Sequence, residues 1–180
     1  MPLSADAWVP LAEVARPHGV RGEIRLRPFN RDSDLLLERD EVLLRFEGGQ
    51  QRAERVEAAR RANDAVLVKL ASISDRTAAE ALRGALVCVR RGDFPPAAEG
   101  EFYVCDLEGA RVLVEQADGA PRELGRVRAV QAYPAADVLV VDAADGGSPW
   151  EVPLLAHVVR AVDVASGTVT LATVEGVERG

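Results

Sequence analysis

The chain has 180 residues, of which 48% are hydrophobic and 28% are charged, and its net charge is −7. This composition is ordinary for a soluble globular protein and excludes wholesale disorder. No stretch approaches the roughly 20 apolar residues of a membrane helix, and the N-terminus lacks the basic flank and apolar run of a signal peptide. We therefore expect a cytoplasmic protein that does not act in a membrane.

Short segments with alternating apolar residues fill the first half of the chain. Ile24 and Leu26 alternate with charged neighbours, and residues 42–46 and 66–70 show the same period of two. Such alternation in short segments that are bounded by turn residues predicts half-buried β-strands. Between the first two strands, residues 16–22 contain two glycines that can adopt the positive φ of a hairpin connection.

One segment does not show this alternation of apolar and polar residues. Within residues 74–84, Ser74 or Asp75 can cap the N-terminus of a helix, and Gly84 stands where a helix commonly ends. The apolar residues between them fall on one helical face. We therefore predict one short helix inside an otherwise β domain.

We place the boundary between two domains in residues 91–100, because the consecutive prolines and small residues there are typical of a semi-stiff linker. The predicted fold class is all-β, with one small barrel over residues 1–90, which includes the short helix, and a second over residues 101–176. The strands expected in the second barrel cover residues 112–114, 124–130, 138–141 and 168–174.

Groups suited to catalysis are scarce. His18 and His157 are the only histidines; we expect His18 in a solvated turn and His157 as a partly buried structural imidazole. Cys88 and Cys105 lack the spacing of a zinc site and are interpreted as buried thiols, with a single regulatory disulfide as the alternative. No nucleophile elbow or phosphate-binding loop is present. The sequence therefore predicts no catalytic residue, no metal site and no cofactor.

Charge is distributed unevenly along the chain. Residues 97–180 hold 6 Lys and Arg against 14 Asp and Glu, whereas residues 1–96 hold 16 against 15. An acidic half should repel RNA and favour encounter with a basic protein, although excess acid also aids solubility.

A local excess of arginine follows the hairpin predicted in the first half. Residues 16–31 carry five arginines and one glutamate. Arg16, Arg21 and Arg25, together with His18, are candidate contacts to RNA phosphates. The alternative is that these side chains form one polar face of a hairpin.

Two adjacent aromatic residues follow the linker in a chain that is only 4% aromatic. If Phe102 and Tyr103 lie on a strand, one ring points into the core and the other points outward. The outward ring would be an interface anchor worth about 2 kcal/mol. In the alternative interpretation, both rings brace the barrel or the seam between domains.

Several short segments are weak signals one by one, whereas their order and spacing along the chain are specific. They are residues 14–24, 75–84, 100–103, 106–109, 124–127, 151–154, 162–163 and 175–177. Together these segments resemble the RimM family of ribosome-maturation factors over nearly the whole chain. The resemblance implies an N-terminal barrel like the second domain of elongation factor Tu, followed by a PRC-type barrel.

The resemblance also implies a function. A RimM-like chain is expected to be a monomeric, non-catalytic factor that binds the free precursor of the small (30S) ribosomal subunit and assists maturation of the head domain of 16S rRNA. The implied direct partner is the nineteenth small-subunit ribosomal protein, a basic head protein, and rRNA contacts are expected only in the assembled particle.

Family positions implied in partner binding fall on Phe102, Tyr103, Asp106, Leu107 and Gly109. Three residues depart from the usual family pattern. Phe102 replaces a tyrosine, Glu108 replaces a common apolar residue, and Trp150 adds a large ring.

Two other functions stay open. An RNA-processing or RNA-modifying enzyme with an unrecognised site would turn over precursor rRNA unaided. A generic PRC-barrel binding module would instead carry a ligand or associate with a membrane complex.

Overall fold

The computed structural model describes residues 3–98, 101–116, 119–132, 136–175 and 177–179. The chain forms two compact units, one over Ser4–Pro95 and one that begins at Pro96, and each is described by itself. Over the described ranges, no helix has the length and apolar character needed to cross a membrane.

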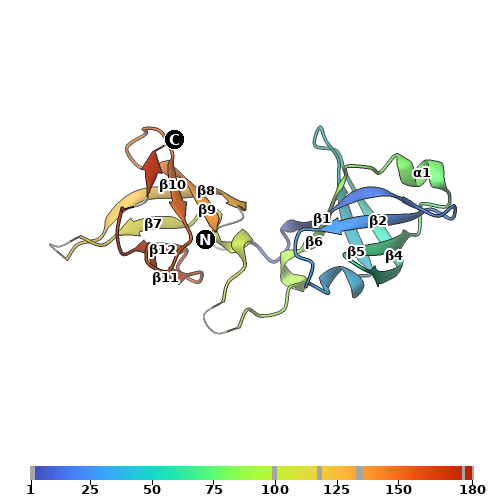
Figure 1. The fold of residues 1–180 in the computed structure, drawn as a ribbon, viewed down its shortest axis with the longest axis horizontal. Coiled ribbons are helices and arrows are strands. Elements are labelled where there is room, and N and C mark those ends of the chain that lie inside the picture. The colour runs from blue at the N-terminus through green and yellow to red at the C-terminus, as the bar shows by residue number, and fades with distance from the viewer. Residues whose placement is uncertain (1–2, 99–100, 117–118, 133–135, 176, 180) are drawn as a thin grey trace. The chain divides into compact units, whose positions relative to one another are not determined.

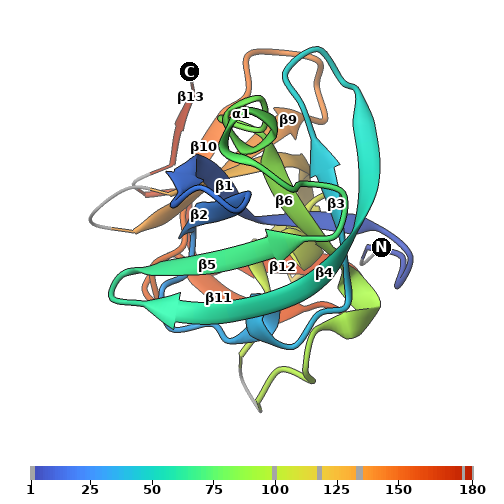
Figure 2. The same cartoon turned by 90° about the vertical axis from the view of Figure 1, so that its right-hand side faces the viewer.

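The first unit is a closed barrel of six strands in the order β1-β2-β5-β4-β3-β6 (Figure 1). All neighbouring strands are antiparallel, and the long strands β4 and β5 lie side by side (Figure 2). Its elements are β1 (Trp8–His18), β2 (Glu23–Pro28), η1 (Leu35–Leu37), β3 (Glu41–Arg45), β4 (Gln51–Ala62), β5 (Ala65–Leu70), α1 (Arg76–Glu80), β6 (Leu86–Arg90) and η2 (Arg91–Asp93).

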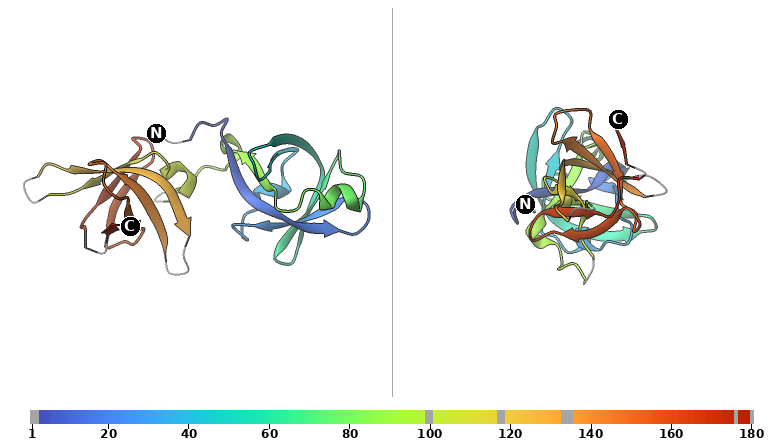
Figure 3. Two further views of the ribbon diagram at one scale, coloured as in Figure 1. Left: turned by 90° about the horizontal axis from the view of Figure 1, so that it is seen from above. Right: turned by 90° about the vertical axis from the view of Figure 1, so that its left-hand side faces the viewer.

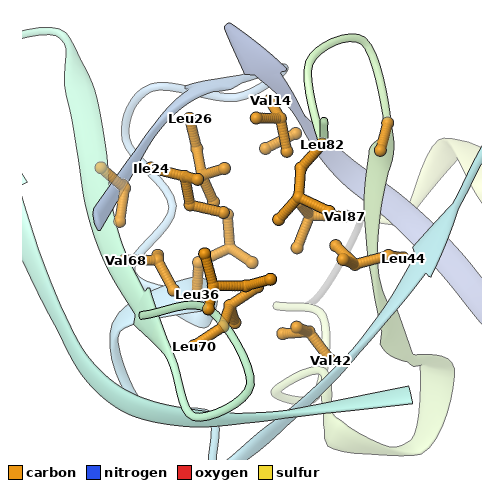
Figure 4. Packing of buried hydrophobic residues seen from close by; sticks show 14 of the residues in the cluster. Val14, Ile24, Leu26, Leu36, Val42, Leu44, Val68, Leu70, Leu82 and Val87 are labelled. Atoms are coloured by element: carbon orange, nitrogen blue, oxygen red, sulfur yellow. The ribbon is translucent and has the colours of Figure 1, made fainter. Parts of the chain in front are cut away.

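The predicted alternation forms the core of this barrel. Ile24 and Leu26 of β2 stand opposite Val68 and Val66 of β5, and all four side chains are buried. Because successive strand residues point to opposite faces, the charged residues between them face outward. Figure 4 shows apolar side chains from the strands, η1 and the segment after α1 meeting inside the barrel. The period-two interpretation is confirmed for β2, whereas Leu43 of β3 and Leu67 of β5 are buried as well, so burial does not alternate along these two strands.

Helix α1 is capped by Asp75, whose carboxylate accepts a hydrogen bond from the backbone N–H of Ala78 at 2.8 Å. The helix ends at Glu80, earlier than Gly84 suggested, because the next residues form tighter i→i+3 turns. Gly84 has a φ of +81°, and its N–H donates to the carbonyl of Val14 at 2.9 Å. The segment after α1 is thereby attached to β1.

The second unit is a curled sheet of seven strands in the order β11-β12-β7-β8-β9-β10-β13. The long yellow-to-orange strands β8 and β9 are visibly bent (Figure 3). Strands β12 and β7 are parallel, and the other pairs are antiparallel. Its elements are η3 (Val104–Leu107), β7 (Arg111–Val114), β8 (Arg122–Ala132), β9 (Asp137–Ala143), β10 (Trp150–Pro153), β11 (Val159–Asp163), β12 (Thr168–Leu171) and β13 (Glu178–Arg179).

The concave side of this sheet holds a second core of its own. Leu107, Leu139 and Leu171 are fully buried there, together with valines from several strands. Trp150 packs against the edge of this core, with the guanidinium of Arg179 4.2 Å from its ring centre. The all-β prediction is therefore correct for both halves, and the last predicted strand ends at Leu171 rather than at residue 174.

Candidate functional site

The two adjacent aromatic residues lie in an extended segment directly before η3, and neither belongs to a strand. The prediction that they alternate across a strand is therefore wrong. The chain tightens here, because the N–H of Asp106 donates to the carbonyl of Tyr103 at 2.9 Å and closes a 3₁₀ turn. Both Phe102 and Tyr103 are half-buried, and Phe102 packs against the second core.

The residues that follow the aromatic pair hold this segment in place from the interior of the second unit. Asp106 and Leu107 are only 3% and 1% exposed, so in this structure they support the segment and do not offer a contact surface. Gly109 is exposed, has a φ of +80°, and donates its N–H to the carbonyl of Val127 at 2.8 Å. A left-handed glycine of this kind turns the chain from η3 into β7.

A groove of about 620 Å³ lies beside Phe102. One wall comes from Glu101 and Phe102, and the others come from the β10–β11 connection and from β11. The larger apolar side chains of its lining are half-buried and pack against the second core, so the groove exposes the margin of that core. The remaining lining residues are Leu154, Leu155, Ala156, Val159, Arg160, Ala161, Val162, Asp163 and Val164.

The charges around the groove are predominantly negative. Arg160 is ion-paired with Glu115, so its charge is already compensated. Asp163 accepts a hydrogen bond from the backbone N–H of Ser166 at 3.0 Å, and this bond lowers the pKa of the Asp163 carboxyl. Asp163 therefore carries its negative charge at neutral pH, and Glu101 is a second, exposed acidic residue of the lining.

The β1–β2 hairpin carries the predicted arginine contacts, and the structure separates them into two kinds. Arg25 is ion-paired with Asp64 at 2.9 Å, and Arg27 is ion-paired with Glu13 at 2.7 Å. Arg16 and Arg21 are exposed, and no ion pair joins either of them to a described residue. Among the described arginines of β1, β2 and the turn between them, Arg16 and Arg21 therefore have guanidinium groups that are available to an external anion.

The tip of this hairpin is packed against the segment that precedes α1. Gly22 has a φ of +78°, and a Cβ atom placed on it would lie 2.4 Å from the carbonyl oxygen of Ile73. Arg76 of α1 donates to the carbonyl of Gly19 at 3.2 Å. Val20 is 74% exposed beside a hollow of about 550 Å³ that Arg21 and the half-buried His18 also line.

Neither histidine has the predicted environment. His157 is exposed and not partly buried, because it lies in the turn between β10 and β11. His18 is half-buried at the end of β1 and not fully solvated. Across the described ranges, no three His, Cys, Asp or Glu side chains gather closely enough to hold a metal ion.

The two cysteines are not joined in a disulfide, and they differ in burial. Cys88 on β6 is completely buried, and this burial raises the pKa of its thiol. Cys105 in η3 is half-buried, so the prediction of two buried thiols is correct only for Cys88.

Comparisons with known proteins point to one family for both units. Residues 9–94 match the RimM N-terminal domain model, and residues 104–177 match the RimM PRC barrel domain model. The chain is 52% identical to "Ribosome maturation factor RimM" of Sorangium cellulosum, covering 94% of this chain and 96% of that protein. The chain belongs to the RimM family.

Other RimM proteins align over similar lengths. "Ribosome maturation factor RimM" of Sphingopyxis alaskensis is 36% identical, covering 96% of this chain and all of that protein. A crystal structure of a RimM protein from Pseudomonas aeruginosa has a TM-score of 0.46 and 24% identity, covering 93% of this chain and 98% of that chain. Phe102 and Tyr103 lie just before the part that matches the PRC barrel model.

The two thiols of this RimM chain are expected to react at different rates. In the folded protein, iodoacetamide should alkylate Cys105 at least about tenfold faster than Cys88, because the Cys88 thiolate is both inaccessible and disfavoured. Mass spectrometry of a labelling time course measures both rates, and Cys88→Ala assigns the fast site. Equal rates in the folded chain would contradict the difference in burial.

Proposed function

We propose that this chain is an assembly factor that binds the free precursor of the small ribosomal subunit in the cytoplasm and acts there as a monomer. It would assist maturation of the head domain of 16S rRNA without catalysing a reaction. The observation that carries this proposal is membership of the RimM family over both units, because full-length relatives are named ribosome maturation factors.

The second unit is the part that we propose to hold a protein partner. Its groove combines an apolar lining next to Phe102 with the acidic side chains of Glu101 and Asp163 at its rim. Such a surface suits a basic protein better than an RNA backbone, because like charges repel. The proposed partner is the nineteenth small-subunit ribosomal protein, a basic protein of the 30S head.

Within this proposal, the chain acts by stabilising one conformation of the particle. A factor that binds the correctly folded head more tightly than misfolded competitors shifts the population toward the former. Enzymatic turnover is the competing function.

Sedimentation of a lysate that contains the tagged protein tests the proposal. Co-migration with free small subunits, together with absence from translating ribosomes, is the expected result. An even spread over the gradient, or no ribosomal association, would overturn it. Purified protein incubated alone with precursor 16S rRNA should neither cleave nor modify it, and any turnover would favour the enzymatic alternative.

The free arginines of the hairpin are proposed to contact rRNA in the assembled particle. The double variant Arg16→Ala/Arg21→Ala should weaken binding to the 30S precursor about tenfold. It should also make the plot of log binding constant against log salt concentration less steep, by the amount expected for the loss of roughly one to two phosphate contacts. The matched double variant Arg25→Ala/Arg27→Ala should change binding much less, because these side chains are already ion-paired. Salt-dependent binding titrations distinguish the two, and equal losses would contradict the assignment.

A further inference from the structure

Strand β11 forms one edge of the curled sheet. It pairs with β12 on one side, and its other side pairs with no strand among the described residues. An open edge presents backbone N–H and C=O groups that can bond to another extended chain. The edge is five residues long, which corresponds to about 16 Å at the rise of an extended strand.

The groove beside Phe102 follows this open edge. All residues of β11, from Val159 to Asp163, line it, and Leu154 and Leu155 line it together with Phe102. Recognition by strand addition requires main-chain groups on an edge and pockets for alternate side chains of the incoming segment. An open edge and an adjoining groove for a side chain therefore lie together at this place in the second unit.

The edge is also protected against indiscriminate pairing. The register of β11 with β12 shifts between Val159 and Ala161. This irregularity restricts regular pairing to the residues after the shift, from Ala161 to Asp163. The exposed side chains of Arg160 and Asp163 add charge along the same strand. Bulges and charges of this kind keep natural sheet edges from aggregating, so this edge is suited to a specific partner.

We propose that a basic protein partner adds an extended segment to β11 and places an apolar side chain in the groove against Phe102. This inference rests on the proposed function, which supplies the basic partner. Charge selects the occupant: Glu101 and Asp163 stand at the rim, and Arg160 is compensated by Glu115. A second copy of this unit would bring the same acid excess, and RNA has no peptide backbone to continue the sheet.

Hydrogen exchange on the full chain, free and mixed with the purified nineteenth small-subunit ribosomal protein, tests this inference. Within residues 159–164, the amides that point away from β12 should exchange at least about tenfold more slowly in the complex, because new backbone bonds protect them. The amide of Val159 is excluded, because it already donates to the carbonyl of Leu155 at 2.8 Å. Amides of β4 in the first unit provide the internal reference. Binding without protection of residues 159–164 would overturn strand addition while leaving the proposed function intact. Absence of binding would overturn both.

A matched pair of substitutions separates groove occupancy from overall charge. Ala161 is exposed and lines the groove, whereas Ala165 is exposed in the β11–β12 turn and does not line it. Ala161→Arg should weaken binding of the ribosomal protein at least about tenfold, and Ala165→Arg less than about twofold. Ala161→Gln should give an intermediate loss, because it adds bulk without charge. Equal losses for the two arginine variants would overturn the inference.

Discussion

Replacing both Phe102 and Tyr103 by alanine is expected to weaken association with free small-subunit precursors about thirtyfold, which corresponds to about 2 kcal/mol. The two rings are half-buried at the start of the second unit, and Phe102 forms part of the wall of the groove. Aromatic side chains in such partly enclosed positions dominate the binding energy of interfaces. Sedimentation of the tagged double variant, with quantification of the bound fraction, measures the loss.

The double substitution also removes packing, because Phe102 contacts the second core. Val130→Ala provides a matched control, since Val130 is half-buried against the same core but does not line the groove. The Val130→Ala variant should bind precursors as tightly as the unaltered chain does. Its loss of thermal stability should be comparable with that of the double variant. Phe102→Tyr keeps the ring and should retain association. A folded double variant with undiminished association would remove these residues from the site.

Replacing Gly125 by alanine is expected to destabilise the second unit by about 3 kcal/mol, because the new methyl group has no space. Gly125 lies in β8 with a φ of +157°, and a Cβ atom placed on it would lie 1.9 Å from the carbonyl oxygen of Asp142 in β9. This atom belongs to the backbone of the paired strand and cannot move without breaking the β8–β9 pairing. Close approach of another backbone is a recognised reason for glycine in a strand.

Urea unfolding followed by tryptophan fluorescence measures this effect, because each unit contains one tryptophan. Trp8→Phe leaves Trp150 of the second unit as the only reporter. Gly146→Ala is the matched control: its φ is +71°, but nothing lies within 4 Å of the added methyl group. It should cost about 1 kcal/mol from the left-handed backbone alone. Similar losses at both glycines would refute the steric explanation.

Much of the fold follows from patterns that lie within a few residues of one another. The alternation around Ile24 and Leu26 predicts a strand, and Asp75 before a run of helix-forming residues predicts the cap of α1. The order and spacing of short motifs along the whole chain likewise indicated the RimM family. The strand and cap signals are local, because strand alternation and helix capping depend on neighbouring residues.

The candidate site depended on contacts between distant parts of the chain. Two of the hairpin arginines are ion-paired with residues that are distant in the sequence. Asp64 lies 39 residues from Arg25, and Glu13 lies 14 residues from Arg27. The aromatic pair suggested a strand, but the chain forms a 3₁₀ turn directly after it. Phe102 instead lines a groove together with the β10–β11 connection.

Local sequence therefore indicated the helix cap and several of the strands, among them β2 and β8, whereas β10 and β11 were not predicted from it. The groove, the open edge of β11 and the ion pairs were decided by the tertiary structure alone. The physical reason is that sheet order and side-chain pairing depend on which strands become neighbours, and a period of two within one strand carries no information about its partner.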